Sequence, residues 1–247
     1  MNLNLMEIAC EYKGELNNLY SAGALNKHDL GRFTSWSKGS VRTCEAQMLY
    51  AIIKKFNYKN ILEIGTGNGF STVYLTGAAS FTGGRVDTID IVDKIKSKHL
   101  NLYPLFEPSI REGSVRFHVG DSNIIVPSLQ DRYDFILIDG SHEYEQTKLD
   151  FKNSYDKLQP GGCIAFHDSY KTPEGVFGVR DAIDEVIKDY PDLNIFFFTE
   201  EIFDFFSYSE DIDDANRIKE KWKERNYSYS HPTANPKCLM AVAFKSL

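Results

Sequence analysis

Apolar residues from Asn60 onward form short runs that alternate with longer segments, in which apolar positions recur every three or four residues. The short runs are rich in Val, Ile and Phe and are typical of buried strands, whereas the longer segments are typical of amphipathic helices. Strands are predicted at Ile61 to Ile64, Arg85 to Ile91, Val115 to Val119, Phe135 to Ile138, Cys163 to Phe166, Asn194 to Phe198 and Leu239 to Phe244. Helices are predicted at Phe70 to Ala79, Ile95 to Phe106, Asn123 to Leu129, Tyr144 to Leu158 and Val176 to Tyr190. This alternation predicts an α/β fold with a doubly wound, mostly parallel seven-stranded sheet and helices on both faces.

Two further regions flank or interrupt the sheet segment. Residues 1–58 are predicted to be an N-terminal helical extension, with a break from Gly31 to Ser40 and a strong apolar stripe in Glu45 to Phe56. Residues 59–247 are predicted to be the sheet domain, with a polar and aromatic insertion at about 200–237 that contains a helix at Asp213 to Arg225. Both regions flank the ligand-binding edge of such a sheet, so we expect them to form a ligand pocket or a dimer contact.

Composition narrows the class of protein. The 247 residues are 42% hydrophobic and carry a formal net charge of -7, which is typical of a soluble globular protein and argues against nonspecific nucleic-acid binding. No apolar run approaches the roughly 20 residues that span a bilayer, and the N-terminus lacks the pattern of a secretory signal. We therefore expect a cytoplasmic protein. Four scattered cysteines, which suit neither a disulfide framework nor a zinc site, are expected to be reduced thiols: Cys10, Cys44, Cys163 and Cys238.

The most informative motif joins the first strand to a helix. Glu63 lies on the strand, the turn reads Gly65-x-Gly67-x-Gly69, and the helix opens with Ser71. Glycines allow a sharp turn and a close ligand approach, and a helix N-terminus offers free N–H groups to an anion. The spacing G-x-G-x-G differs from the dinucleotide fingerprint G-x-G-x-x-G. A purely structural turn, with Ser71 as a helix cap, is the alternative.

The next two strands also end in acids. An acid 20 to 25 residues after the glycines is where a ribose-binding carboxylate belongs, and Asp90 suits that place better than Asp87 or Asp93. A solvated acid at a strand end is the alternative. The third strand ends at Asp121 and Ser122, where Asp121 can bind a ligand, cap the following helix, or do both.

The fourth and fifth strands deliver two pairs of ionisable residues. Asp139 ends one strand and His142 follows three residues later, while His167 and Asp168 end the other. Carboxylates that converge at one sheet edge are costly unless a cation holds them, which favours a divalent metal. The alternatives are a capping acid for Asp139, a surface histidine for His142, a structural histidine for His167 and a turn-forming acid for Asp168.

These motifs resemble a known family. The glycine turn with Glu63 resembles motif I of class I S-adenosylmethionine-dependent methyltransferases. IDGSHEY followed by LQPGGCIAFHD resembles the metal-dependent macrocin and mycinamicin-type sugar O-methyltransferases, with catechol-type enzymes as more distant relatives. The resemblance covers roughly Thr43 to Asp189 and implies a Rossmann-like methyltransferase fold.

The resemblance also implies residue roles. The methionine end of S-adenosylmethionine would lie at Glu63, Gly65, Gly67 and Ser71, the ribose at Asp90, and the adenine at Asp121 and Ser122. Mg²⁺, or Mn²⁺, would be held by Asp139, His167 and Asp168, with His142 as general base. The chain departs from the family at His167, where relatives carry an acid. This change weakens Mg²⁺ binding, shifts the preference toward Mn²⁺ or Fe²⁺, or means that His167 is no ligand.

The expected function is methyl transfer to a hydroxyl of a small molecule, such as a sugar or a catechol, with Asp139 and His142 as the catalytic residues. The expected partners are this acceptor and, through the flanking regions, a second copy in a homodimer or higher homo-oligomer, with no nucleic acid and no membrane. One alternative is a noncatalytic, cofactor-binding relative that uses the insertion as a partner surface. An NAD-dependent oxidoreductase is a minor alternative, because Glu63 and the glycine spacing argue against it.

Overall fold

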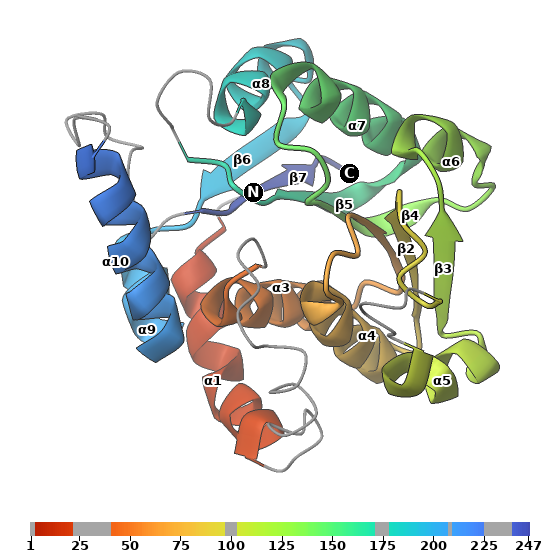
Figure 1. The fold of residues 1–247 in the computed structure, drawn as a ribbon, viewed down its shortest axis with the longest axis horizontal. Coiled ribbons are helices and arrows are strands. Elements are labelled where there is room, and N and C mark those ends of the chain that lie inside the picture. Colours follow the sequence, from red (N-terminus) through yellow and green to blue (C-terminus); the bar gives the residue numbers. More distant parts are fainter. Residues whose placement is uncertain (1–2, 22–40, 97–102, 171–177, 207–208, 225–238) are drawn as a thin grey trace.

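A single sheet of seven strands organises the chain (Figure 1). The computed structural model describes residues 3–21, 41–96, 103–170, 178–206, 209–224 and 239–247. The strand order is β3-β2-β1-β4-β5-β7-β6, and β7 runs antiparallel to both of its neighbours while the other pairs are parallel. The strands are β1 (Asn60–Ile64), β2 (Arg85–Asp90), β3 (Val115–Val119), β4 (Tyr133–Ile138), β5 (Leu158–Phe166), β6 (Leu193–Phe197) and β7 (Ala241–Lys245). The order reverses between β1 and β4, which is where open α/β sheets place a ligand crevice.

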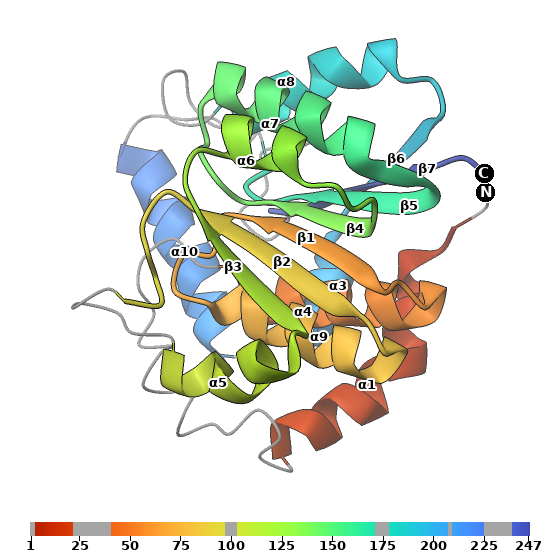
Figure 2. The ribbon, with the colours of Figure 1, turned by 90° about the vertical axis from the view of Figure 1, so that its right-hand side faces the viewer.

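Helices cover both faces of the sheet (Figure 2). One layer contains α1 (Leu5–Ser21), α3 (Thr43–Phe56), α4 (Phe70–Thr82), α5 (Tyr103–Glu112) and α9 (Glu200–Phe206), and the other contains α6 (Ser122–Ser128), α7 (Tyr144–Lys157) and α8 (Val179–Val186). A 3-10 turn, Ile187–Asp189, follows α8, and α10 (Ser209–Glu224) follows α9. The predicted doubly wound fold is therefore confirmed.

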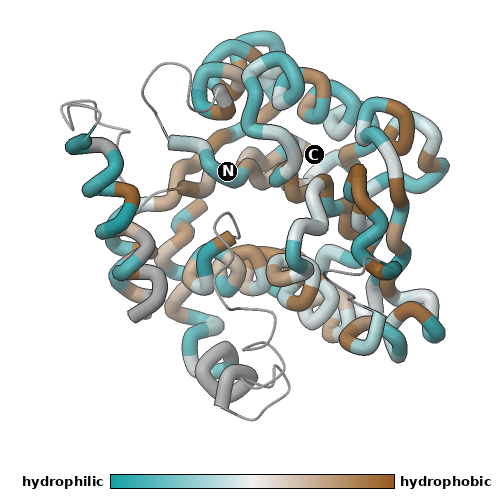
Figure 3. Tube along the Cα trace, viewed as in Figure 1, coloured by the Kyte–Doolittle hydropathy of each residue, from teal (hydrophilic) through white to brown (hydrophobic). Residues whose placement is uncertain are grey.

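Alternate residues of each strand face the two layers, so the sheet separates two apolar cores. Ile61 and Phe135 pack with the α3 and α4 side, whereas Leu62 and Ile136 pack with the α7 side. The central strands and α3 are largely hydrophobic, while α10 is mainly hydrophilic (Figure 3). Within the described residues, no helix combines the length and the apolar character needed to cross a bilayer.

The N-terminal segment contributes directly to one of these cores. Ala46, Leu49, Ile52 and Ile53 of α3 are at most 1% exposed. They lie in the same apolar cluster as the sheet residues, and α3 packs against α4. The helix predicted at Glu45 to Phe56 therefore belongs to one of the two helical layers that cover the sheet. The predicted break from Gly31 to Ser40 lies outside the described residues.

One predicted helix is misplaced along the chain. The segment Ile95 to Phe106 was expected to be helical, but Ile95 and Lys96 form a turn and the helix α5 spans Tyr103–Glu112. Pro104 lies in the first turn of α5, where its fixed φ and its missing N–H are tolerated, so it starts the helix. Residues 97–102 lie outside the described part, as do 176–177 of another predicted helix, Cys238, and 225–238 of the insertion.

Candidate active site

The carboxyl ends of β1, β2, β3 and β4 open onto a cavity of about 660 Å³. Its walls come from the turns that follow these four strands, together with residues of α4 and α7. The cavity contains most of the predicted ligand-binding residues: Gly65, Gly67, Ser71, Asp90, Asp121, Ser122, Asp139 and His142. Glu63, His167 and Asp168 are buried and do not line it.

The turn after β1 requires glycine for two different reasons. Gly65 has a φ of 99°, and a Cβ placed on it would lie 2.0 Å from the carbonyl oxygen of Asp139. Gly67 has a φ of 52°, but a Cβ there would meet nothing within 4 Å. Close approach of the β1 and β4 turns therefore demands Gly65, whereas only the left-handed backbone favours Gly67.

The side chain of Glu63 connects β1 to the start of α4, directly after this turn. Its side chain is fully buried, with Oε1 accepting a hydrogen bond of 2.6 Å from Ser71 and Oε2 accepting bonds of 2.6 Å from Thr72 and Thr88. Both of its oxygens therefore bind hydroxyls of the protein, and the expected contact between Glu63 and a cofactor stays a prediction. Thr88 pairs with Glu63 in the β1–β2 register, which the sequence alone did not reveal. Burial raises the pKa of Glu63 to about 7, against the opposing effect of the three hydroxyls.

Asp90 holds the rim of the cavity. Its Oδ2 accepts a hydrogen bond of 3.0 Å from the Gly67 amide, and its Oδ1 accepts one of 2.9 Å from the Val92 amide. Asp87, in the middle of β2, is instead buried and pairs with Arg116 and with His118 at 2.6 Å each. The structure therefore places Asp90, rather than Asp87, beside the glycine turn.

Asp121 and Ser122 occupy the end of the cavity at β3. Asp121 caps α6, because its carboxylate accepts a hydrogen bond of 2.8 Å from the Asn123 amide, and it also lines the cavity. Ser122 donates a hydrogen bond of 2.6 Å to Asp150 of α7. Asp150 is 1% exposed and lines the cavity, yet sequence reasoning missed it. The available signal was an acid on the buried face of a helix, next to Phe151.

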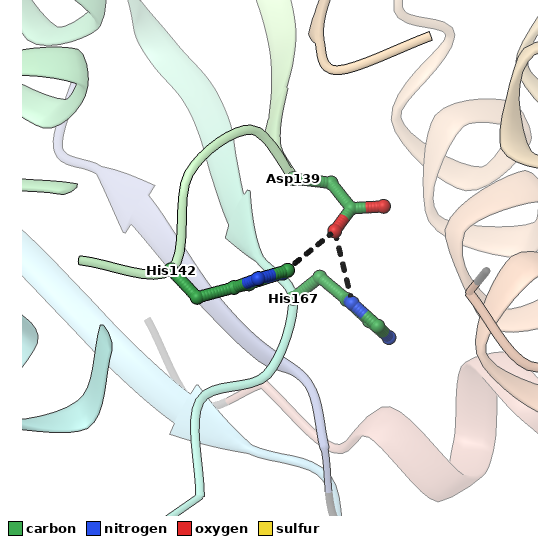
Figure 4. A group of neighbouring side chains, drawn as sticks. All are labelled: Asp139, His142 and His167. Atoms are coloured by element: carbon green, nitrogen blue, oxygen red, sulfur yellow. Dashed lines mark hydrogen bonds and ion pairs between the residues drawn. The ribbon is translucent and has the colours of Figure 1, made fainter. Parts of the chain in front are cut away.

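Four ionisable side chains meet where β4 and β5 end. Figure 4 shows one carboxylate oxygen of Asp139 joined by dashed lines to both His142 and His167. The distances from Asp139 Oδ1 are 3.0 Å to His167 Nδ1 and 3.8 Å to His142 Nε2. Asp168, whose φ is 49°, places Oδ2 3.0 Å from His142 Nε2. The two predicted pairs therefore form one cluster.

A fifth residue joins this cluster from α3. Glu45 is 2% exposed, and its Oε2 lies 3.2 Å from Nε2 of His167, a residue 122 positions away in the sequence. The same oxygen accepts a hydrogen bond of 2.9 Å from the Arg42 amide. His167 thus lies between two carboxylates, Glu45 from α3 and Asp139 from the end of β4. The sequence did not predict this arrangement, because no local pattern links the helix to either strand.

The carboxylates change the protonation of both histidines. Burial lowers the pKa of His142, but its bonds to Asp139 and Asp168 outweigh burial and raise the pKa to about 9. The pKa of His167 is also raised well above its usual value, because the attraction of Asp139 and Asp168 exceeds the effect of burial. These carboxylates therefore favour the protonated form of His142, whereas a general base or a metal ligand requires the neutral imidazole.

Residues 62–169, which include both the glycine turn and this cluster, match a family model described as "Methyltransferase domain". This segment is therefore similar to a methyltransferase domain. The family model matches no further part of the chain, and the macrocin-type subgroup stays a prediction.

Solved structures show that the chain has the class I methyltransferase fold. The O-methyltransferase TomG from Streptomyces achromogenes, involved in tomaymycin synthesis and solved in complex with SAM, has a TM-score of 0.59 at 15% identity over 87% of this chain and 86% of its own. An O-methyltransferase from Bacillus cereus in complex with SAH has a TM-score of 0.59 at 18% identity over 94% and 90%. Cofactor-bound Rv0187 from MTB has a TM-score of 0.60 at 17% identity over 91% and 88%.

A curated relative is also similar in sequence. The uncharacterized protein R132 of Acanthamoeba polyphaga mimivirus is 26% identical in an alignment of 128 residues that covers 44% of this chain. The match spans 57% of the length of that relative. This match assigns no activity to the chain.

The cluster fits a divalent metal, and its group of candidate ligands shares Asp139 and His167 with the predicted set. Asp139, His142 and His167 each offer one ligand atom, and these atoms lie within 4.8 Å of one another. His142 thus joins the predicted ligands Asp139 and His167, while Asp168 pairs with His142. Two imidazole nitrogens and one carboxylate oxygen suit Mn²⁺, Fe²⁺ or Zn²⁺ better than Mg²⁺, which prefers oxygen ligands.

Proposed function

We propose that this methyltransferase binds S-adenosylmethionine in the 660 Å³ cavity and transfers its methyl group to a hydroxyl of a small molecule, such as a sugar or a catechol. One observation carries the proposal: a single cavity joins the Gly65–Gly67 turn and Asp90 to the cluster at Asp139 and His142. A donor site and a site that can activate an oxygen therefore lie next to each other. Two similar structures hold SAM or SAH, which supports the same donor here.

The cavity residues suit the parts of this donor. Asp90 uses one lone pair of each oxygen for the Gly67 and Val92 amides, so further lone pairs can accept hydrogen bonds from the two ribose hydroxyls. Gly65 and Gly67 line the cavity at the turn after β1, where the methionine end would lie. Asp90, Asp121 and Asp139 place negative charge along the cavity, which favours a donor that carries a positive sulfonium.

The reaction breaks the bond between the sulfonium sulfur and the methyl carbon and forms a bond from that carbon to the acceptor oxygen. The sulfonium is a good leaving group, so the protein must chiefly align the acceptor and help it to lose its proton. A ring nitrogen of His142 is one of the atoms offered to a cation, so its role in this proposal is that of a ligand rather than a base. A ligand histidine must be neutral, so a bound cation would displace the proton that Asp139 and Asp168 favour on His142.

The ligands of a divalent cation in this proposal are Asp139, His142 and His167. Such a cation, when bound, lowers the pKa of an acceptor hydroxyl. The hydrogen bond between Glu45 and Nε2 of His167 keeps the proton on that nitrogen and turns Nδ1 toward Asp139. The ligand set leads us to propose Mn²⁺ in preference to Mg²⁺.

Thermal unfolding with and without ligands tests the donor. We expect S-adenosylhomocysteine to raise the melting temperature of the wild type and NADH to leave it unchanged. Asp90→Ala should lose most of this rise in melting temperature. Asp93→Ala should keep it, because Asp93 accepts hydrogen bonds from the amides of the turn at Ile95 and Lys96 and does not line the cavity. Stabilisation by NADH alone would instead favour an oxidoreductase, and binding without turnover over a broad acceptor panel would favour a noncatalytic relative.

Electron paramagnetic resonance of Mn²⁺ tests the metal separately. The free ion should lose signal on titration with the wild type, and Asp139→Ala should bind at least about tenfold more weakly. The control is Glu112→Gln, which changes an exposed acid at the end of α5 that is not one of the candidate ligands. This variant should bind Mn²⁺ as the wild type does. Equal binding by the wild type and Asp139→Ala would remove the metal from the proposal and leave the donor site intact.

A further inference from the structure

Gly178, at the start of α8, is bound to the turn that carries His142. Its amide donates a hydrogen bond of 2.8 Å to the His142 carbonyl oxygen. The turn, residues 139–143, connects β4 to α7 and forms neither helix nor strand. None of the roles above uses Gly178. Its hydrogen bond nevertheless links α8 to one of the proposed metal ligands.

Space, rather than backbone conformation, requires glycine at position 178. Gly178 has a φ of -106° and a ψ of 3°, a region that other residues also occupy. A Cβ placed on it, however, would lie 2.5 Å from both the amide nitrogen and the Cβ of Tyr144, and 2.7 Å from its Cα. Tyr144 opens α7, two residues after His142. A side chain at position 178 would therefore push on the backbone that leads out of the His142 turn.

The two helices are held too firmly to move apart for such a side chain. Figure 2 shows α7 and α8 side by side in one layer. Val179 and Ile183 anchor α8 in the apolar core, and Phe151 anchors α7 in the same core. Residues 139–143 lack the repeated backbone hydrogen bonds of a helix or strand. The turn would therefore yield first, and His142 would move with it.

The imidazole of His142 is sensitive to such a displacement. Its Nε2 lies 3.0 Å from Asp168 Oδ2, and a shift of about 1 Å is enough to take a side chain out of its productive position. The Thr147 hydroxyl also holds the turn, by donating a hydrogen bond of 2.9 Å to the Glu143 carbonyl oxygen. That bond comes from α7 itself, whereas Gly178 attaches the turn to a separate helix.

We propose that Gly178 is a positioning residue for His142. Its amide fixes the carbonyl of the turn, and its missing side chain lets α8 begin directly against Tyr144, so that the imidazole reaches the cation site. The proposal rests on the proposed function, because it needs His142 as a ligand of a bound cation. Gly178 does not line the donor cavity. Its replacement should therefore weaken metal binding and leave donor binding unchanged.

Two titrations of Gly178→Ala test this split. Electron paramagnetic resonance should show that the variant binds Mn²⁺ at least about tenfold more weakly than the wild type does. Calorimetry should show that its affinity for S-adenosylhomocysteine stays within about threefold of the wild-type value. A glycine that only lets two helices pack would lower the melting temperature when replaced and would leave both affinities of the folded protein unchanged.

Two further variants are the controls. Glu185→Gln weakens the same pair of helices at another point, because Glu185 of α8 binds Lys148 of α7 at 2.7 Å. This change leaves the contact between Gly178 and His142 in place. Gly14→Ala changes a glycine of α1 whose Cβ would meet nothing within 4 Å. Both controls should bind Mn²⁺ as the wild type does.

The outcomes separate this proposal from the proposed function. The role of Gly178 is overturned if the wild type binds Mn²⁺ and Gly178→Ala binds it equally well. It is also overturned if Glu185→Gln weakens Mn²⁺ binding as much, or if Gly178→Ala loses S-adenosylhomocysteine in parallel. Absence of Mn²⁺ binding by the wild type would instead remove the metal from the proposed function, and this proposal with it.

A crystal structure of the wild type with Mn²⁺ decides the case in which Gly178→Ala does not fold. We expect the Gly178 amide to stay within about 3.2 Å of the His142 carbonyl oxygen while the imidazole binds the ion. A turn that leaves Gly178 in order to bind the ion overturns the assignment.

Discussion

Glu63 should make the stability of the protein fall as the pH rises from about 4.5 to about 7. Its carboxyl group is fully buried, and burial raises its pKa from 4.5 to about 7. In this pH window the folded protein keeps a proton on Glu63 that the unfolded chain releases. The favourable contribution is therefore complete below the unfolded pKa and is lost as the pH rises through the folded pKa.

The size of this effect follows from the shift in pKa. One unit corresponds to about 1.4 kcal/mol, so the free energy of unfolding should drop by about 3 kcal/mol across the window because of Glu63. Other groups also titrate. Burial alone would raise the pKa of Asp87, but His118 and Arg116 outweigh burial and lower it, so Asp87 loses its stabilising contacts only at lower pH. A difference between the wild type and Glu63→Gln isolates the contribution of Glu63.

Urea unfolding followed by circular dichroism, from about pH 4.5 to about pH 8, provides the assay. Glu63→Gln cannot ionise, so its free energy of unfolding relative to the wild type should rise by about 3 kcal/mol with increasing pH. The exposed Glu112→Gln is the control, and its difference from the wild type should stay within about 0.5 kcal/mol throughout. A difference for Glu63→Gln that is independent of pH, or that falls with rising pH, would refute the reasoning.

Three further predictions concern the site. Gly65→Ala should abolish binding of S-adenosylhomocysteine and destabilise the protein, because the new Cβ would overlap the Asp139 carbonyl. Gly67→Ala should lower the free energy of unfolding by only about 1 kcal/mol and keep the fold. Equal effects of the two variants in calorimetry and thermal melts would contradict this prediction. Glu45→Gln should weaken Mn²⁺ binding by about 10- to 100-fold in electron paramagnetic resonance titrations, because His167 loses its carboxylate partner. Unchanged affinity would show that Glu45 does not orient His167 for metal binding. His167→Asp should raise the affinity for Mg²⁺ relative to Mn²⁺ in competition titrations, and an unchanged ratio would exclude His167 as a ligand.

The sequence revealed the parts of the site that follow directly from strands. Gly65, Asp90 and Asp139 each come after a short apolar run, and parallel strands bring their carboxyl ends to one edge, so their proximity could be predicted. The same logic predicted seven strands, and all seven form one sheet.

The parts that the sequence did not reveal depend on helices and on burial. Glu45 reaches His167 from a helix 122 positions away, and Asp150 reaches Ser122 from the buried face of α7. Helical periodicity predicts that such faces are buried but not which polar group each one meets. The raised pKa of His142 could not be predicted for a related reason, because the two carboxylates that raise it follow separate strands.

A calorimetric titration of the purified protein with S-adenosylhomocysteine tests the central claim most directly. The account predicts saturable binding of one ligand to each chain in the wild type, and a loss of at least about tenfold in affinity for Asp90→Asn, whose amide replaces a charged acceptor for the ribose. Absence of binding by a folded wild type, or equal affinities of the wild type and Asp90→Asn, would contradict the account.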